Sequence, residues 1–320
     1  MQMNHTKKQA INLQPGTLIT GKWTKKSYRV LNKLGEGACG VVYLCEYESK
    51  RVALKISQDS SRITTEVNVL KTFQKVQGKR LGPSLMGVDD WIRPNGTRLH
   101  FYVMEYIKGY TLSTFLRGKG KEWVGILILQ MLTDLHDLHQ AGWVFGDLKT
   151  DNLLVSYPPA RIRWIDVGGT TQNGRAIKEY TEFYDRGYWQ MGSRKAEPSY
   201  DLFAVTMIML EIGRSGRFER GTKPQQTLLK QLSLSPILKP YEKTIRNVWE
   251  GSIQSSAAMK NEISVVLTAR QNDTPQQPTR RARQRSSGDQ KQAGGHAAME
   301  MGFISVVVCF FYFIYIWIGM

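Results

Sequence analysis

The most restrictive feature of the sequence is a run of glycines between two strand-like segments. Residues 34–42 read LGEGACGVV, which places Gly35, Gly37 and Gly40 ahead of Val42. Glycines let the backbone turn tightly and lie over phosphate groups without a side-chain clash. Alternating apolar residues on both sides predict short antiparallel strands over 28–56. A dinucleotide-binding fold would need a helix directly after the glycines, so the strand pattern argues against that fold.

Two charged residues follow the glycine run in a meaningful order. VALK at 52–55 ends a predicted strand with Lys55, which can bind the α- and β-phosphates of a nucleotide. The apolar spacing over 61–76 predicts a helix, and Glu66 lies on it. Such a lysine needs a carboxylate to hold it, so we expect Glu66 to pair with Lys55.

The next group of motifs comes after a long predicted helix at 122–142. In GDLKTDN, Asp147, Lys149 and Asn152 keep the spacing D-x-K-x-x-N. Asp147 can orient or deprotonate a substrate hydroxyl, Lys149 can neutralise charge on a transferring phosphoryl group, and Asn152 can ligate magnesium. IDVGG at 165–169 then supplies Asp166 as the main magnesium ligand.

These motifs, in this order, resemble those of the eukaryotic-type (Hanks) serine/threonine protein kinases over about residues 28–268. The resemblance implies an α+β, bilobal protein kinase-like fold with a β-rich N-terminal lobe and a helical C-terminal lobe. It also implies ATP and Mg²⁺ as cofactors and protein substrates with serine or threonine hydroxyls. YVMEYIKGYTL at 102–112 looks like the segment that joins the lobes, with the purine beside it. The predicted cofactor-binding residues are Gly35, Gly37, Gly40, Val42, Ala53, Lys55, Glu66, Met104, Glu105 and Ile107.

The chain departs from the family pattern in four places. Phe145 and Gly146 replace the usual His-Arg before Asp147, and Val167 replaces the usual Phe after Asp166. Without this arginine, the chain lacks the usual cation that pairs with the phosphate of a phosphorylated activation segment. Ala-Glu-Pro at 196–198 is a scrambled form of the usual A-P-E. The first three changes concern regulation and packing and remove no group that handles nucleotide, metal or substrate hydroxyl, whereas the fourth bears on the floor of the peptide-binding site and on the stability of the activation segment. Asp201 resembles the aspartate that hydrogen-bonds the catalytic-loop backbone.

The composition changes near residue 270. We interpret 1–27 as a lead-in, 28–268 as the kinase domain and 269–300 as a polar, basic, disordered linker. Residues 301–320 contain no charged residue, and as a helix they would span about 30 Å, the thickness of one hydrocarbon core. A buried core helix is the alternative. The positive-inside rule predicts a single-pass, C-terminal anchor in the cell membrane with the kinase domain in the cytoplasm.

The chain is strongly basic, with 44 Lys+Arg against 27 Asp+Glu and a net charge of +17. Such an excess favours an acidic partner, either nucleic acid or an anionic membrane surface. Within the linker, TRRARQR at 279–285 can be the charge flank of the anchor, a lipid-binding segment or a non-specific DNA-binding segment. The cations of this segment are Arg280, Arg281, Arg283 and Arg285.

A short kinase domain, a basic linker and a C-terminal anchor together look similar to the YabT-like membrane kinases of spore-forming bacteria. That resemblance implies cytosolic protein substrates, DNA binding and a role in sporulation, and self-association would allow autophosphorylation. Two other functions compete with an active kinase: a pseudokinase that binds nucleotide or DNA without phosphoryl transfer, and a small-molecule phosphotransferase. The retained Lys55, Asp147, Asn152 and Asp166 favour the active kinase.

Overall fold

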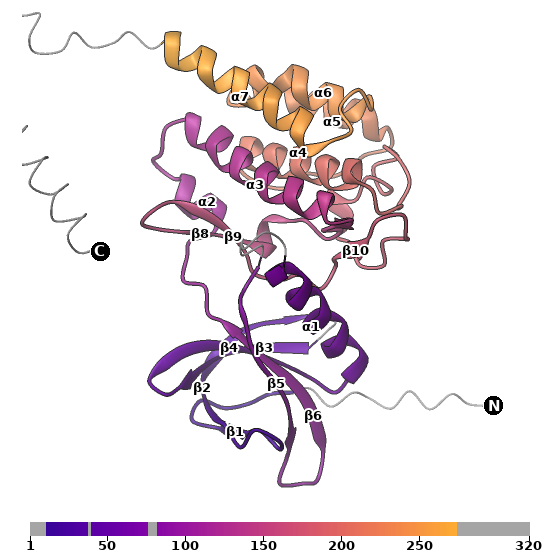
Figure 1. The fold of residues 1–320 in the computed structure, drawn as a ribbon. Coiled ribbons are helices and arrows are strands. Elements are labelled where there is room, and N and C mark those ends of the chain that lie inside the picture. The colour runs from indigo at the N-terminus through magenta and orange to yellow at the C-terminus, as the bar shows by residue number, and fades with distance from the viewer. Residues whose placement is uncertain (1–10, 38–39, 76–81, 274–320) are drawn as a thin grey trace, which may run out of the picture. The chain divides into compact units, whose positions relative to one another are not determined.

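The computed structural model describes residues 11–37, 40–75 and 82–273, with strands early in the chain and helices later (Figure 1). One antiparallel sheet has the strand order β1-β2-β3-β4-β6-β5. Its strands are β1 (Leu18–Thr20), β2 (Ser27–Gly37), β3 (Gly40–Tyr47), β4 (Lys50–Ser57), β5 (Leu85–Ile92) and β6 (Arg98–Glu105).

The two faces of this sheet are buried against different partners, as strand alternation requires. On β4, Val52, Leu54 and Ile56 point to one face and join a core made by the strands and the segment before them. Ala53 and Lys55 alternate with them, and Ala53 belongs to the second core with residues of α1 (Ser60–Lys75). The sheet therefore presents Lys55 on the face that α1 covers.

The C-terminal part is built around α4 (Pro198–Arg214), in which every residue from Tyr200 to Leu210 is buried. A helix that is buried on all sides, with mostly apolar residues, lies in the centre of a core. The other helices are α2 (Leu112–Leu116), α3 (Glu122–Gln140), α5 (Pro224–Ser233), α6 (Glu242–Trp249) and α7 (Ser256–Asp273).

Short elements connect α3 to α4 and carry the polar motifs. They are β7 (Trp143–Val144), the 3-10 turn η1 (Thr150–Asn152), β8 (Leu153–Ser156), β9 (Arg161–Trp164), β10 (Thr171–Gln172) and η2 (Glu182–Tyr184). β8 and β9 form a two-stranded antiparallel pair, and β7 pairs with β10. These pairings fix both ends of the loops that hold the catalytic motifs.

The predicted helices over 61–76, 122–142 and 201–213 are confirmed within a few residues, as are the strands over 28–56 and 98–107. Two boundaries differ. β1 lies inside the segment interpreted as a lead-in, because Ile19 is apolar and fills the core of the sheet. α7 continues to Asp273, past the predicted boundary at 268.

Among the described residues, no helix has both the length and the apolar character that a membrane crossing requires. The predicted anchor at 301–320 and the linker arginines at 280, 281, 283 and 285 lie outside the described residues.

Candidate active site

The glycines lie at the facing ends of two strands, with Gly35 and Gly37 on β2 and Gly40 on β3, and Gly37 is the register partner of Gly40. Gly40 has φ of +138°, and a Cβ there would lie 2.5 Å from the carbonyl oxygen of Ile56. No other residue fits this position without moving β4. A Cβ on Gly35 or Gly37 would meet no neighbouring atom within 4 Å, so packing inside the protein does not explain those two glycines.

Lys55 and Glu66 form the predicted ion pair. Lys55 Nζ donates to Glu66 Oε1 at 2.8 Å and lies 2.8 Å from Oε2, and both side chains are buried. Burial raises the pKa of the Glu66 carboxyl, while the adjacent Lys55 ammonium opposes that rise. Lys55 also lies 3.8 Å from Asp166 Oδ1, so one lysine is shared between α1 and the loop after β9.

The predicted purine-binding residues lie near Lys55 on the sheet. Ala53 is the cross-strand partner of Met104, Val42 pairs with Lys55, and Ala53, Met104 and Ile107 are buried. The Glu105 N–H donates to the Ser84 carbonyl at 2.9 Å, so this donor is already used. The Glu105 side chain is held by Ser84 and Arg163. Backbone contacts to a purine are therefore left to the Glu105 carbonyl and the residues after it.

Asp166 and Asn152 lie on neighbouring segments, because the Ile165 N–H donates to the Asn152 carbonyl at 3.0 Å. The Asn152 side chain is buried and donates through Nδ2 to the Asp147 carbonyl, whereas the Asp166 side chain is half exposed. A carboxylate and an amide oxygen suit Mg²⁺, which also takes water and phosphate oxygens. The residues present thus fit a magnesium site that a nucleotide completes.

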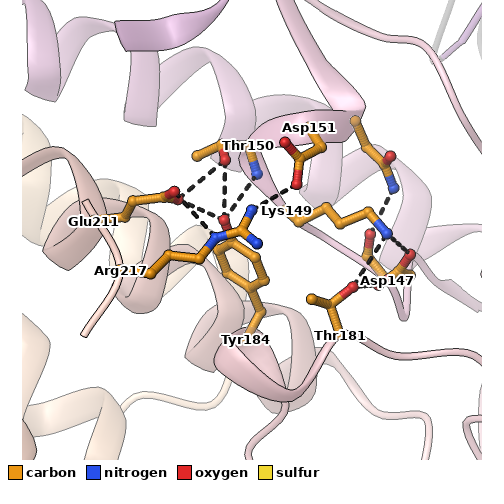
Figure 2. Close-up of polar contacts among 9 residues, drawn as sticks. Asp147, Lys149, Thr150, Asp151, Thr181, Tyr184, Glu211 and Arg217 are labelled. Carbon is orange, nitrogen blue, oxygen red and sulfur yellow. Dashed lines mark hydrogen bonds and ion pairs between the residues drawn. The ribbon is translucent and has the colours of Figure 1, made fainter. Parts of the chain in front are cut away.

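The acceptor side of the site is centred on Asp147 (Figure 2). Lys149 Nζ donates to Asp147 Oδ2 at 2.5 Å, and the Thr181 hydroxyl donates to Asp147 Oδ1 at 2.9 Å. Lys149 also contacts the Thr181 hydroxyl at 3.1 Å. The catalytic loop and the activation segment therefore meet at the carboxylate expected to receive a proton. Thr181 is one of several hydroxyl residues in the segment 169–195, and no sequence motif singles it out.

The buried Asp201 side chain fixes the backbone of the catalytic loop, as expected. It accepts hydrogen bonds from the N–H groups of Phe145, at 2.7 Å, and Gly146, at 3.0 Å. The ring of Phe145 is buried against Trp164, with centroids 4.5 Å apart. A buried aromatic ring thus packs in the core at the position where the motif has histidine.

Comparison with known proteins gives the same assignment. A family model described as "Protein kinase domain" matches residues 28–277. Serine/threonine-protein kinase YabT of Bacillus subtilis (strain 168) is 47% identical over 324 residues, covering 96% of each chain. Cyclin-dependent kinase G-2 of Oryza sativa subsp. indica is 26% identical over 61% of this chain and 29% of its own length.

The chain belongs to the protein kinase family. It is a serine/threonine kinase with the bilobal kinase fold. A solved structure of vaccinia related kinase 3 matches 82% of this chain and 93% of that chain, with a TM-score of 0.60 and 16% identity. That likeness supports the fold alone.

In this kinase, the scrambled Ala-Glu-Pro still anchors the activation segment. Glu197 forms an ion pair with the buried Arg186, whose guanidinium also donates to the Ser193 carbonyl and the Ser199 hydroxyl. The adjacent Asp185 carboxylate is buried and accepts from the Tyr200 hydroxyl and from Arg194. The segment is thus held by its own ion pairs in this structure.

Sequence reasoning missed a second polar group next to the catalytic loop (Figure 2). The Tyr184 and Thr150 hydroxyls both donate to Glu211 Oε2, and Arg217 pairs with Glu211 and with Asp151. Arg217 also lies over the ring of Tyr184, 5.1 Å from its centroid. These residues come from four separate segments, so motif spacing contains no signal that could join them.

Proposed function

We propose that this chain is an ATP- and Mg²⁺-dependent kinase that phosphorylates serine and threonine hydroxyls of cytosolic proteins while tethered to the cell membrane. The observation that carries the proposal is the joint placement of Lys55–Glu66, Asp166 and the Asp147–Lys149–Thr181 group. Nucleotide-side and acceptor-side groups are both present, so the chain has what both halves of the reaction need.

The chemistry assigned to these residues is a direct phosphoryl transfer. The substrate hydroxyl oxygen bonds to the γ-phosphorus as the bond from that phosphorus to the β–γ bridging oxygen breaks, and ADP leaves with the electron pair. Asp147 takes the hydroxyl proton, and Lys149 neutralises charge on the phosphoryl oxygens. Lys55, held by Glu66, positions the α- and β-phosphates. Mg²⁺, held by Asp166 and Asn152, would neutralise the remaining phosphate charge.

The direct test uses the full-length chain in detergent with labelled ATP, Mg²⁺ and a generic protein substrate. We expect label on serine and threonine and none on tyrosine, with EDTA abolishing transfer. Binding of ATP without transfer under any condition would replace this proposal with the pseudokinase alternative.

Membrane tethering rests on the uncharged apolar residues 301–320 and on the cations before them. To test the tether, the full chain and a variant that lacks residues 301–320 are expressed separately and compared. We expect the full chain to sediment with membranes and resist extraction at high pH, and the deleted chain to stay in the supernatant. Equal extraction of both proteins would rule out the anchor.

We further propose that the linker arginines at 280, 281, 283 and 285 bind DNA without sequence preference and gather kinase molecules on one polyanion. Replacing all four with glutamine should lower the slope of log affinity against log salt by up to about 3 to 4, because each phosphate contact contributes about 0.9. An unchanged slope would refute the site. If the variant loses affinity for anionic vesicles but keeps its affinity for DNA, the linker's partner is lipid instead.

A further inference from the structure

Tyr102 is a buried polar residue of the nucleotide side to which the kinase resemblance assigns no role. It lies on β6 and is the direct cross-strand partner of Lys55 on β4. Directly opposed residues of antiparallel strands project to the same face with their Cβ atoms about 5 Å apart. Strand register therefore places a phenol beside the phosphate-binding lysine, on the face that α1 covers.

The Tyr102 hydroxyl is directed at the carboxylate of Glu66. It donates to Glu66 Oε2 at 2.7 Å, while Lys55 donates to Oε1 at 2.8 Å. Lys55 on β4 lies 2.8 Å from each oxygen of this buried carboxylate, and the phenol on β6 adds a second donor at Oε2. Burial raises the pKa of the Glu66 carboxyl, and the hydrogen bond from Tyr102 acts in the other direction. Two donors on different strands fix the orientation of the carboxylate plane, which one flexible lysine cannot do alone.

One and two turns further along α1, on the helix face that carries Glu66, the apolar contact is smaller than the family motif provides. Val167 stands where the motif has a phenylalanine whose packing sets the active arrangement. A Cβ added to Gly82 would lie 3.2 Å from Val167, 3.5 Å from Phe73 and 3.7 Å from Leu70, so Val167 lies near this end of α1. Valine buries less apolar surface than phenylalanine. With this smaller apolar contact, the hydrogen bonds to Glu66 matter more for holding α1 in position.

We propose that Tyr102 is a positioning residue for phosphoryl transfer: its hydroxyl holds the Glu66 carboxylate in the orientation in which Glu66 presents Lys55 to the nucleotide phosphates. The inference rests on the proposed ATP-dependent transfer. Tyr102 does not touch the reacting atoms and acts through Glu66. Phenylalanine at 102 would fill nearly the same volume and leave Glu66 Oε2 without this donor, so Tyr102→Phe isolates the hydroxyl.

The experiment measures steady-state kinetics of the full-length chain with Tyr102→Phe. We expect kcat/KM for ATP to fall about tenfold, as for a lost hydrogen bond to a charged group, with KM for the protein substrate unchanged. The matched control is Tyr43→Phe, which removes another buried tyrosine hydroxyl of the sheet, one that donates to the Ile11 carbonyl. We expect the control to lower thermal stability without changing kcat/KM for ATP.

A double-mutant cycle with Glu66→Met separates positioning from general packing. If Tyr102 acts through Glu66, adding Tyr102→Phe to Glu66→Met should change kcat/KM by less than about twofold. An equal tenfold loss in both backgrounds, or wild-type kinetics for Tyr102→Phe, would overturn the inference. Absence of transfer by the unsubstituted chain would instead contradict the proposed function. In that case the dissociation constant for Mg·ATP, measured for the unsubstituted chain, the two single variants and the double variant, replaces kcat/KM in the cycle.

Discussion

The nucleotide side and the acceptor side of this site both depend on ion pairs, but they differ in their exposure to water. On the nucleotide side, the Lys55 and Glu66 side chains are 6% and 4% exposed. On the acceptor side, the Lys149 and Asp147 side chains are 22% and 15% exposed, and the neighbouring Arg217 and Asp151 side chains are 41% and 63% exposed.

This difference matters because burial changes what an ion pair does. A buried charge that loses its partner keeps its full desolvation cost, whereas an exposed charge is resolvated by water. The Lys55–Glu66 pair is therefore built into the core and coupled to folding, whereas Asp166 on the same side is 50% exposed. The acceptor side, which is more exposed, can change its charges at little cost in stability.

The largest effect on stability should come from breaking the buried pair. Lys55→Met leaves Glu66 without its ammonium partner, so we expect the free energy of unfolding to fall by about 3 kcal/mol together with a loss of ATP binding. Thermal and denaturant unfolding check the first effect, and nucleotide titration checks the second. Unchanged stability would show that the nucleotide side is no more coupled to folding than the acceptor side.

A second test addresses the backbone of the catalytic loop. Gly146 has φ of +82°, and a Cβ there would lie 2.5 Å from the Gly169 carbonyl oxygen. We expect Gly146→Ala to lower the unfolding free energy by about 2 to 3 kcal/mol and to reduce kcat, because the loop must move away from Gly169.

Gly174→Ala is the matched control for that test. Gly174 has φ of +87° with no atom within 4 Å of an added Cβ, so it reports left-handed strain alone, about 1 kcal/mol. Equal losses in the two variants would mean that the close approach to Gly169 does not constrain the loop. The same geometry explains why an arginine cannot simply be restored at 146.

The smallest effect should come from the exposed pairs. Arg217→Gln removes the contacts to Asp151 and Glu211, yet we expect a change in unfolding free energy below about 1 kcal/mol that shrinks further at high salt. Unfolding at low and high ionic strength measures it. A loss as large as that of Lys55→Met would remove the distinction between the two sides.

Much of the fold and of the site could be predicted from the sequence, for a physical reason. Phosphates, metal and a proton acceptor require particular groups in a fixed order, so Lys55, Asp147, Asn152 and Asp166 stand out as a spaced set. Strand alternation and helical periodicity likewise indicated the sheet and the main helices. These signals are local, or they are fixed by the chemistry of transfer.

The missed features depend on long-range geometry. Tyr102 faces Glu66 because of the register between β4 and β6, and strand spacing does not specify that register. Arg217 meets Asp151 across 66 residues of chain. Arg186 anchors Glu197 from within an irregular segment, where neither helical nor strand periodicity applies. The left-handed backbone of Gly146 also becomes evident only once Gly169 packs against it.

The measurement that tests the account most directly compares the full-length chain with its Asp147→Asn variant for both transfer and ATP binding. Asparagine keeps the shape of the side chain but cannot accept the hydroxyl proton, so we expect kcat to fall roughly 10³-fold. The dissociation constant for Mg·ATP should stay within about twofold, since the buried nucleotide side is separate from the acceptor carboxylate. Undiminished transfer by the variant would contradict the assignment of Asp147 and the division of labour between the two sides.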